Sequence, residues 1–227
     1  MKYLIFDAGP LINFSMNGLL PMLEKLKKEF KGQFIITKEV KREIIDVPLG
    51  IKKYELEALR LQDAFNKKII QHADLTEKEI DELRLIRDRL MQVANNTFKT
   101  KKGYLHLIDK GESAALALSI LMKKKFKENI PLVVDERTTR MLVENPDNLK
   151  KYFERKFNAQ INVNKKNYQE FAEFKIIRST ELAYVIWKKN LLEIKDSRAL
   201  EAMVYALKFH GCSITDGEIE EMKRLVR

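Results

Sequence analysis

Four short apolar runs, separated by long stretches of helical periodicity, constrain the fold of this chain more than any other feature of its sequence. The runs occupy residues 3–6, 34–36, 131–134 and 174–177. Continuous apolar runs of this length are typical of strands that are buried on both faces. Buried strands that alternate with helices indicate an α/β fold with a central, mainly parallel sheet.

Helical patterns and capping signals fill the sequence between these runs. Thr37 is a good N-cap for a helix that stops before Pro48, and residues 76–79 and 215–218 have the capping-box pattern. Residues 95–104 are polar, basic and aperiodic, which predicts a loop. We expect one domain over residues 1–227, with helical insertions at about 51–95 and 146–172 and a helical C-terminal part from about 178 to 227.

Composition restricts the cellular compartment and the binding partners that we expect for this chain. With 227 residues, of which 45% are hydrophobic, the chain can bury one sizeable core. A formal net charge of +10 favours polyanionic partners, of which nucleic acid is the commonest, although a lysine-rich surface is the simpler alternative. A single cysteine, Cys212, and no apolar run long enough to span a bilayer predict a cytoplasmic protein without membrane contact.

Acidic residues stand where the predicted strands end and where helices begin. They are Asp7 and Asp135 after the first and third runs, Glu43 in the helix after the second run, and Glu112 in the first turn of a later helix. Ligands of a parallel α/β sheet bind outside the carboxyl ends of its strands, so such acids can share one edge. Gathered carboxylates repel unless a cation neutralises them, and oxygen ligands without a His or Cys cluster favour Mg²⁺ or Mn²⁺.

Each acid also has an ordinary structural interpretation. An Asp at a strand end can cap the next helix, and Asp109 with Glu112 fits a capping box. Glu43 can pair with nearby Lys or Arg on the surface, and Asp135 can pair with an arginine of the following helix. The order of all four acids along the chain is what favours a shared site.

That order resembles the PIN-domain family of nucleases. Residues 3–12 (YLIFDAGPLI) resemble its opening strand, aspartate and small-residue turn, and residues 37–44 (TKEVKREI) resemble its second motif. Residues 109–118 (DKGESAALAL) resemble the third motif in an archaeal-type variant built on D-x-G-E, and residues 133–137 (VVDER) resemble the fourth. The third acid is an Asp in many members, which leaves Asp109 as a substitute for Glu112 or as a neighbouring group.

The resemblance implies a three-layer α/β/α domain and a Mg²⁺- or Mn²⁺-dependent nuclease that acts on RNA. Asp7 and Asp135 would bind the metal directly, and Glu43 and Glu112 would complete the catalytic site through the metal or its waters. Asp109 is a further candidate, as a ligand or as a group that holds a water. The family also suggests homodimers, and an antitoxin protein as partner if the chain is the toxin of a toxin–antitoxin pair.

Basic and aromatic residues near these motifs predict a nucleic-acid surface. The candidates are Lys99, Lys101, Lys102, Tyr104, Arg137 and Arg140. Basic groups meet phosphates and aromatic rings stack on unpaired bases, although lysine runs are often only solvated faces. The sequence therefore favours an endoribonuclease, either a toxin or an RNA-processing enzyme. The alternative is a non-catalytic protein that keeps the fold and binds nucleic acid or a protein partner.

Overall fold

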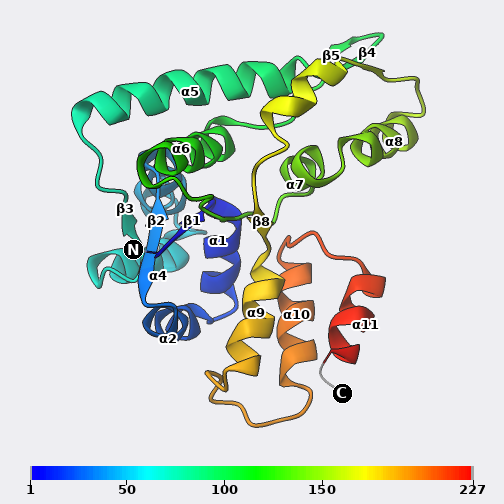
Figure 1. The fold of residues 1–227 in the computed structure, drawn as a ribbon. Helices are drawn as coiled ribbons and strands as arrows, with labels where there is room; N and C mark the ends of the chain where they lie inside the picture. The colour runs from blue at the N-terminus through cyan, green and yellow to red at the C-terminus, as the bar shows by residue number, and fades with distance from the viewer. Residues whose placement is uncertain (1, 226–227) are drawn as a thin grey trace.

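A parallel sheet lies at the centre of the protein, whose computed structural model describes residues 2–225 (Figure 1). Its strand order is β3-β2-β1-β6-β8, and every pairing is parallel. The strands are β1 (Lys2–Phe6), β2 (Gly32–Ile36), β3 (Gln71–His72), β6 (Leu132–Val133) and β8 (Ile176–Ile177). The predicted α/β class with a mainly parallel sheet is confirmed, and each of the four apolar runs contributes a strand.

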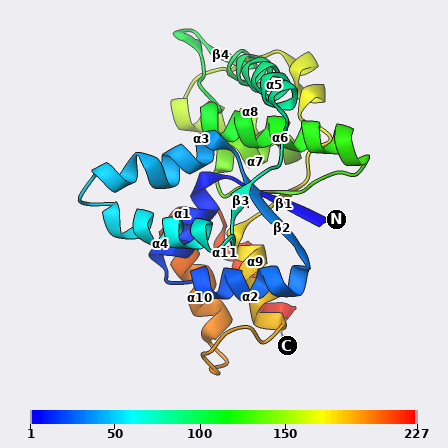
Figure 2. The same cartoon turned by 90° about the vertical axis from the view of Figure 1, so that its left-hand side faces the viewer.

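Helices cover both faces of this sheet, because successive side chains of a buried strand point in opposite directions. Leu4 and Phe6 of β1 join one apolar cluster, whereas Ile5 between them joins the other. The first layer holds α1 (Ala8–Met16), α2 (Leu20–Phe30), α4 (Glu55–Asn66), α9 (Ser179–Lys188), α10 (Ala199–Phe209) and α11 (Asp216–Arg224). The second layer holds α5 (Glu77–Asn95), α6 (Lys110–Phe126), α7 (Arg137–Glu144) and α8 (Pro146–Phe157). Figure 2 shows the strands between these layers, which gives the three-layer α/β/α architecture.

A small antiparallel sheet replaces the loop that was predicted for residues 95–104, so that prediction is wrong. The sheet contains β4 (Phe98–Thr100), β5 (Gly103–Tyr104) and β7 (Asn162–Val163) in the order β5-β4-β7. Phe98 is fully buried and its ring lies 5.6 Å from that of Phe153. A single buried apolar residue in a polar stretch gives no periodicity, so the sequence carried little signal of this hairpin.

The two predicted insertions contain more than helices. The range 51–95 includes β3, which extends the central sheet beside β2. The range 146–172 includes β7 and a 3₁₀ helix at Lys165–Glu170. Within residues 2–225, no helix is both long enough and apolar enough to cross a membrane.

Candidate functional site

Asp7 lies at the carboxyl end of the central strand β1, where it also occupies the N-cap position of α1. Only 5% of the residue is exposed. Burial raises the pKa of Asp7 well above its ordinary value, and the nearby charges of Glu112, Glu43 and Asp109 raise it further against the lowering effect of the Ala8 N–H. Proteins rarely bury a carboxylate among other carboxylates without a compensating charge, because both burial and repulsion disfavour ionisation.

Glu112 reaches this group from the first turn of α6. Its Oε2 accepts the backbone N–H of Asp109 at 2.9 Å, while Asp109 Oδ1 accepts the N–H of Gly111 at 3.0 Å and of Glu112 at 3.3 Å. The capping box expected from the sequence is therefore confirmed. The other carboxylate oxygen of Glu112, Oε1, accepts a hydrogen bond from the Thr139 hydroxyl at 2.8 Å. Although Glu112 takes part in this capping box, its charge also raises the pKa of Asp7.

Burial raises the pKa of Glu112 to about 7. The Asp109 N–H and the Thr139 hydroxyl oppose this rise, whereas the charges of Glu136 and Asp109 add to it. A carboxyl group with a pKa near 7 exchanges its proton readily at neutral pH, which is characteristic of functional sites but not confined to them.

Glu43 comes from the segment that follows β2. Thr37 ends that strand and caps α3 (Lys38–Lys41), its hydroxyl accepting the Val40 N–H at 3.2 Å as the sequence predicted. The helix continues as a π-helical turn, Arg42–Asp46, which carries Glu43. Such turns are frequent at functional sites. Although Glu43 is exposed on one side, partial burial of its carboxyl group and the charge of Asp109 raise its pKa.

Gly111 permits the close approach of Glu43 to α6. A Cβ atom at position 111 would lie 2.7 Å from Glu43 Oε2, which is closer than such atoms pack. A cleft of about 500 Å³ opens beside this contact. Its walls include Glu43, Asp109 and Gly111 together with the basic residues Lys38, Arg42 and Lys110. The cleft thus combines acids that can hold a cation with cations that can hold a phosphate.

Asp135 ends β6, which pairs with β1 as the sequence prediction required. Its carboxylate, however, is held by protein donors: Asn13 Nδ2 lies 2.6 Å from Oδ2, and the Ser179 N–H lies 2.8 Å from Oδ1. Only 2% of Asp135 is exposed, and its charge contributes to raising the pKa of the buried Cys212 thiol to about 12, after the larger effect of burial. Asp135 thereby ties α1 to the start of α9.

The two arginines that follow Asp135 have other partners. Arg137 lies over the Tyr152 ring at 5.5 Å, and its Nε donates to the Ser213 hydroxyl at 3.0 Å. Arg140 belongs to an ion-pair group with Glu144 and Glu218, and only 12% of its side chain is exposed. Arg137 therefore remains near the surface as a possible contact for nucleic acid, whereas Arg140 is held inside the protein.

Glu136 is an acid near the site that the sequence interpretation did not single out. It caps α7, its carboxylate accepting the Thr139 N–H at 2.6 Å, and its charge helps to raise the pKa of Glu112. Its position directly after Asp135 at the start of a helix was the available signal. A strand-end rule selects Asp135, whereas the charge that acts on Glu112 is that of the next residue, Glu136.

Oxygen ligands and mutual repulsion both fit a hard divalent cation at this cluster. Asp7, Glu43 and Glu112 offer only carboxylate oxygens, which suit Mg²⁺ and Mn²⁺ better than zinc. A bound cation would reverse the effects that raise the pKa of these groups, since it favours their charged forms. Within residues 2–225, no three or more His, Cys, Asp or Glu side chains already stand at the spacing of a metal site.

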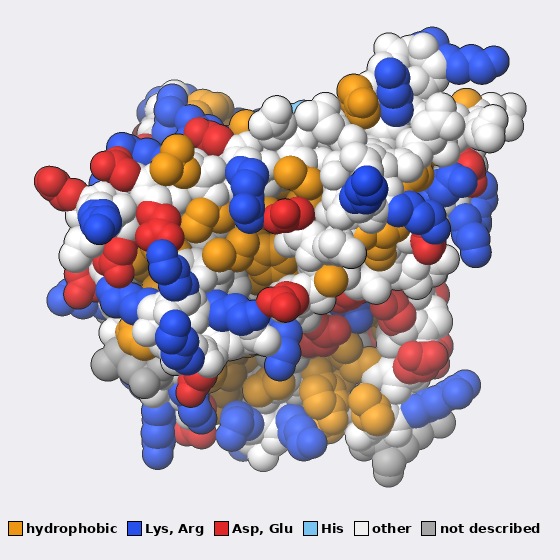
Figure 3. All heavy atoms as spheres, turned by 45° about the horizontal axis from the view of Figure 1, so that its top comes forward, with side chains coloured by type: hydrophobic (Ala, Val, Ile, Leu, Met, Phe, Trp, Pro, Cys, Tyr) orange, Lys and Arg blue, Asp and Glu red, His pale blue; other side chains and the backbone are white. Residues whose placement is uncertain are grey.

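The basic hairpin formed by β4 and β5 projects from the body of the molecule beside α5 and α8 (Figure 1). Lys99, Lys101 and Lys102 are exposed, and the Lys99 ammonium lies 5.0 Å from the centre of the Tyr104 ring. Tyr104 is 56% exposed. Figure 3 shows basic side chains on this projection at the upper right. The segment from the hairpin to Asp109 is anchored by Asn95, whose Oδ1 accepts the N–H groups of Leu107 and Ile108.

Comparison of the chain with protein-family models, with curated proteins and with solved structures finds no match in any of the three.

Proposed function

We propose that the protein is a metal-dependent endoribonuclease that hydrolyses phosphodiester bonds of RNA. The observation that carries the proposal is the burial of Asp7 at the carboxyl edge of the sheet, where Glu112, Glu43 and Asp109 all disfavour its ionisation. That edge is where α/β proteins bind ligands. Keeping carboxylates together there costs stability, so a cation that uses them is the simplest physical reason for the arrangement.

Asp7, Glu43 and Glu112 would hold Mg²⁺ or Mn²⁺. When bound, such an ion polarises the phosphate, lowers the pKa of a water and stabilises the leaving oxygen. Lys38, Arg42 and Lys110 line the cleft beside Glu43 and would hold the phosphates of the strand. Asp109 would keep Glu112 in position through the capping box, because each of the two residues accepts a backbone N–H of the other.

The basic hairpin would bind RNA outside the cleft. Replacing Lys99, Lys101 and Lys102 by Gln should weaken binding of single-stranded RNA and reduce the slope of log K against log salt by up to about 2, at about 0.7 for each phosphate contact. Replacing Lys188, Lys189 and Lys195, which are exposed on and after α9, is the matched control. Equal effects of the two triple variants would show that the hairpin is no special contact.

The proposal includes the finer expectations of a toxin or RNA-processing role, a cytoplasmic setting, a homodimer and an antitoxin partner. A non-catalytic binding protein is the second candidate. The observation in its favour is Asp135, whose carboxylate oxygens both accept hydrogen bonds from within the protein. A fourth acid committed to packing would leave a weaker metal site on an otherwise unchanged fold.

Cleavage of single-stranded RNA separates the two candidates. The wild-type protein should cut RNA with Mn²⁺ or Mg²⁺ and stop on addition of a chelator. Asp7→Asn should lower the rate by roughly a hundredfold or more while the protein stays folded. Asp216→Asn, at a position where 75% of the side chain is exposed, is the matched control and should cleave normally. Chelator-resistant cleavage, or full activity in Asp7→Asn, would remove the proposal.

A further inference from the structure

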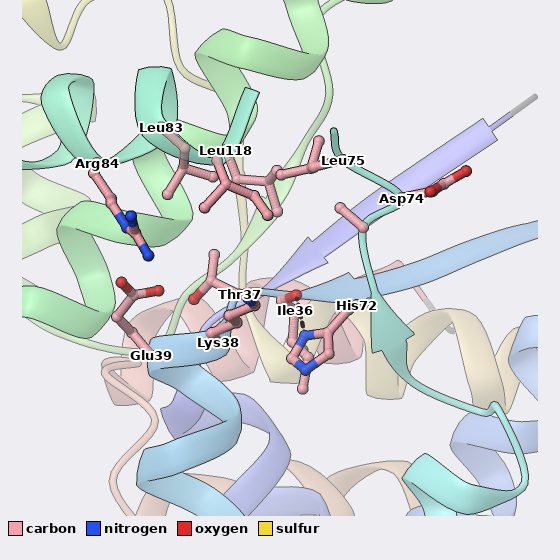
Figure 4. A pocket seen from close by; sticks show the side chains of 12 residues that line it. Ile36, Thr37, Lys38, Glu39, His72, Asp74, Leu75, Leu83, Arg84 and Leu118 are labelled. Carbon is pink, nitrogen blue, oxygen red and sulfur yellow. Dashed lines mark hydrogen bonds between the residues drawn. The ribbon is translucent and has the colours of Figure 1, made fainter. Parts of the chain in front are cut away.

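A second pocket opens at the same edge of the sheet, beyond β2 and β3 (Figure 4). Its volume is about 330 Å³, within the range of roughly 300–1,000 Å³ that small-molecule sites occupy. One wall comes from the ends of the two strands, with Ile36 on β2 and His72 on β3. The opposite wall comes from α5 and α6, through Leu83 and Leu118.

The two walls differ in chemistry, which restricts the ligand. Leu75, Leu83 and Leu118 form an apolar side in Figure 4, while His72, Lys38 and Arg84 supply polar groups. Leucines on one side suit a flat apolar face, and the cations suit a negatively charged substituent. Two acids also line the pocket: Glu39 is paired with Arg87, whose Nη1 lies 2.6 Å from its Oε1, whereas Asp74 lies on the opposite side of the pocket from Lys38 and Arg84 in Figure 4. Arg84 is shared with Asp81 at 2.9 Å, and Lys38 has no ion pair among the described residues, so an anionic substituent fits at the end of the pocket beside these two cations and away from Asp74.

His72 adds a directional group. Its Nδ1 lies 3.3 Å from the carbonyl oxygen of Ile36, shown dashed in Figure 4. A carbonyl oxygen only accepts, so Nδ1 carries the proton and Nε2 of the neutral ring is an acceptor. Burial lowers the pKa of His72, and the charges of Lys41 and Lys38 lower it further against the effect of the Ile36 carbonyl, so the environment favours the neutral ring. The pocket thus places the His72 ring opposite its apolar wall, where the ring can meet the edge of a bound base.

This pocket adjoins the cleft beside Glu43 and Gly111. Lys38 and Glu39 line both cavities, so the two are separated only by the start of α3. A ligand that extends from one to the other would pass these two side chains, with Lys38 positioned to meet a phosphate between them.

We propose that this pocket binds one ribonucleotide of the RNA strand next to the phosphate that is cut. The base would lie against Leu75, Leu83 and Leu118 with its edge toward His72, and Lys38 and Arg84 would hold its phosphate. This inference rests on the proposed function, because the neighbouring cleft is assigned there to the reacting phosphate.

Binding of mononucleotides to the chelator-treated protein tests the inference without any cleavage. The probes are the four ribonucleoside 5′-monophosphates, with ribose 5-phosphate and inorganic phosphate for comparison, each titrated by nuclear magnetic resonance. At least one nucleotide should bind about tenfold more tightly than ribose 5-phosphate, the difference made by the base. Resonances of His72 and Leu83 should shift on binding.

Three variants locate the binding. Arg84→Gln should weaken nucleotide binding several-fold, while Arg89→Gln on the same helix should not; their side chains are similarly exposed, at 57% and 58%, and Arg89 does not line the pocket. Ala73→Leu fills the pocket and should abolish binding. If Ala73→Leu does not fold, the comparison of Arg84→Gln with Arg89→Gln still shows whether the nucleotide binds in this pocket.

Equal affinity for nucleotides and ribose 5-phosphate, or equal effects of Arg84→Gln and Arg89→Gln, would overturn the inference. Its failure is distinct from failure of the proposed function. Metal-dependent cleavage without nucleotide binding in this pocket overturns only the pocket assignment. If the protein cuts no RNA but binds a nucleotide in a way that Arg84→Gln weakens, the pocket is a nucleotide site. The proposed nuclease function, and with it the position of the pocket beside a cut phosphate, would then be wrong.

Discussion

Replacing Glu112 by Gln should stabilise the metal-free protein at alkaline pH. Burial is the largest cause that raises the pKa of Glu112 from 4.5 to about 7. At about 1.4 kcal/mol for each pH unit, the difference between these pKa values corresponds to at most roughly 3 kcal/mol. Gln can keep both contacts of Glu112, since its oxygen accepts the Asp109 N–H and its amide donates to the Thr139 hydroxyl.

The sign of the effect follows from proton binding. Between pH 4.5 and about 7, folded Glu112 keeps a proton that the unfolded chain has released, so the free energy of unfolding falls as pH rises. The penalty is absent below pH 4.5 and complete above about pH 7. Glu112→Gln lacks this penalty, and its advantage over the wild type should grow across that interval.

Urea unfolding at pH 4.5 and pH 8, in the presence of a chelator, measures this difference. Glu79→Gln is the matched control, because Glu79 occupies the same capping-box position in α5. The Thr76 N–H and Lys125 lower the pKa of Glu79, so its replacement should destabilise the protein at pH 8 instead. A Glu112→Gln variant no more stable than wild type at pH 8, or with the same difference at both pH values, would refute the reasoning.

Three further predictions concern single side chains. Gly111→Ala should change the free energy of unfolding by less than about 1 kcal/mol, because an alanine suits a helix, but it should weaken Mn²⁺ binding severalfold by displacing Glu43; unchanged affinity would contradict the close-approach argument. Burial would raise the pKa of Glu218, but Thr215 and Arg178 lower it to about 2, so its stabilising effect should be full above pH 4.5 and lost as pH falls toward 2. Thermal unfolding of Glu218→Gln should accordingly lack that part of the acid dependence, and a curve parallel to wild type would count against the Arg178 contact. Asp135→Ala should cost about 2 kcal/mol or more in urea unfolding, because it leaves the buried Asn13 amide and Ser179 N–H without their acceptor; a neutral effect would contradict its packing role.

The architecture was predictable where burial dominates the sequence. The runs that became β1, β2, β6 and β8 are apolar on both faces because helices cover both sides of the sheet. Edge strand β3 was not predicted, because its two residues, Gln71 and His72, are polar. Their strand conformation depends on parallel pairing with Ile35 and Ile36 of β2, which the local sequence does not show. The hairpin at 98–104 was missed for a related reason, as its position depends on Phe98 packing against distant rings.

The site was predictable only as far as topology determines it. The sequence was sufficient to place Asp7 and Asp135 at one edge, because parallel neighbouring strands end together. It could not give the direction of the Asp135 side chain, which depends on Asn13 and Ser179, residues distant in the chain. The proximity of Glu136 to Glu112 and the pocket beside His72 likewise arise from tertiary packing.

Titration with Mn²⁺, followed by electron paramagnetic resonance of the free ion, tests most directly whether the acids around Asp7 form a cation site. We expect saturable binding to the wild-type protein that competes with Mg²⁺. Asp7→Asn and Glu112→Gln should each weaken it about tenfold or more, whereas Asp216→Asn should leave it unchanged. Mn²⁺ binding of equal strength in the wild type and Asp7→Asn, or no saturable binding at all, would contradict the central claim.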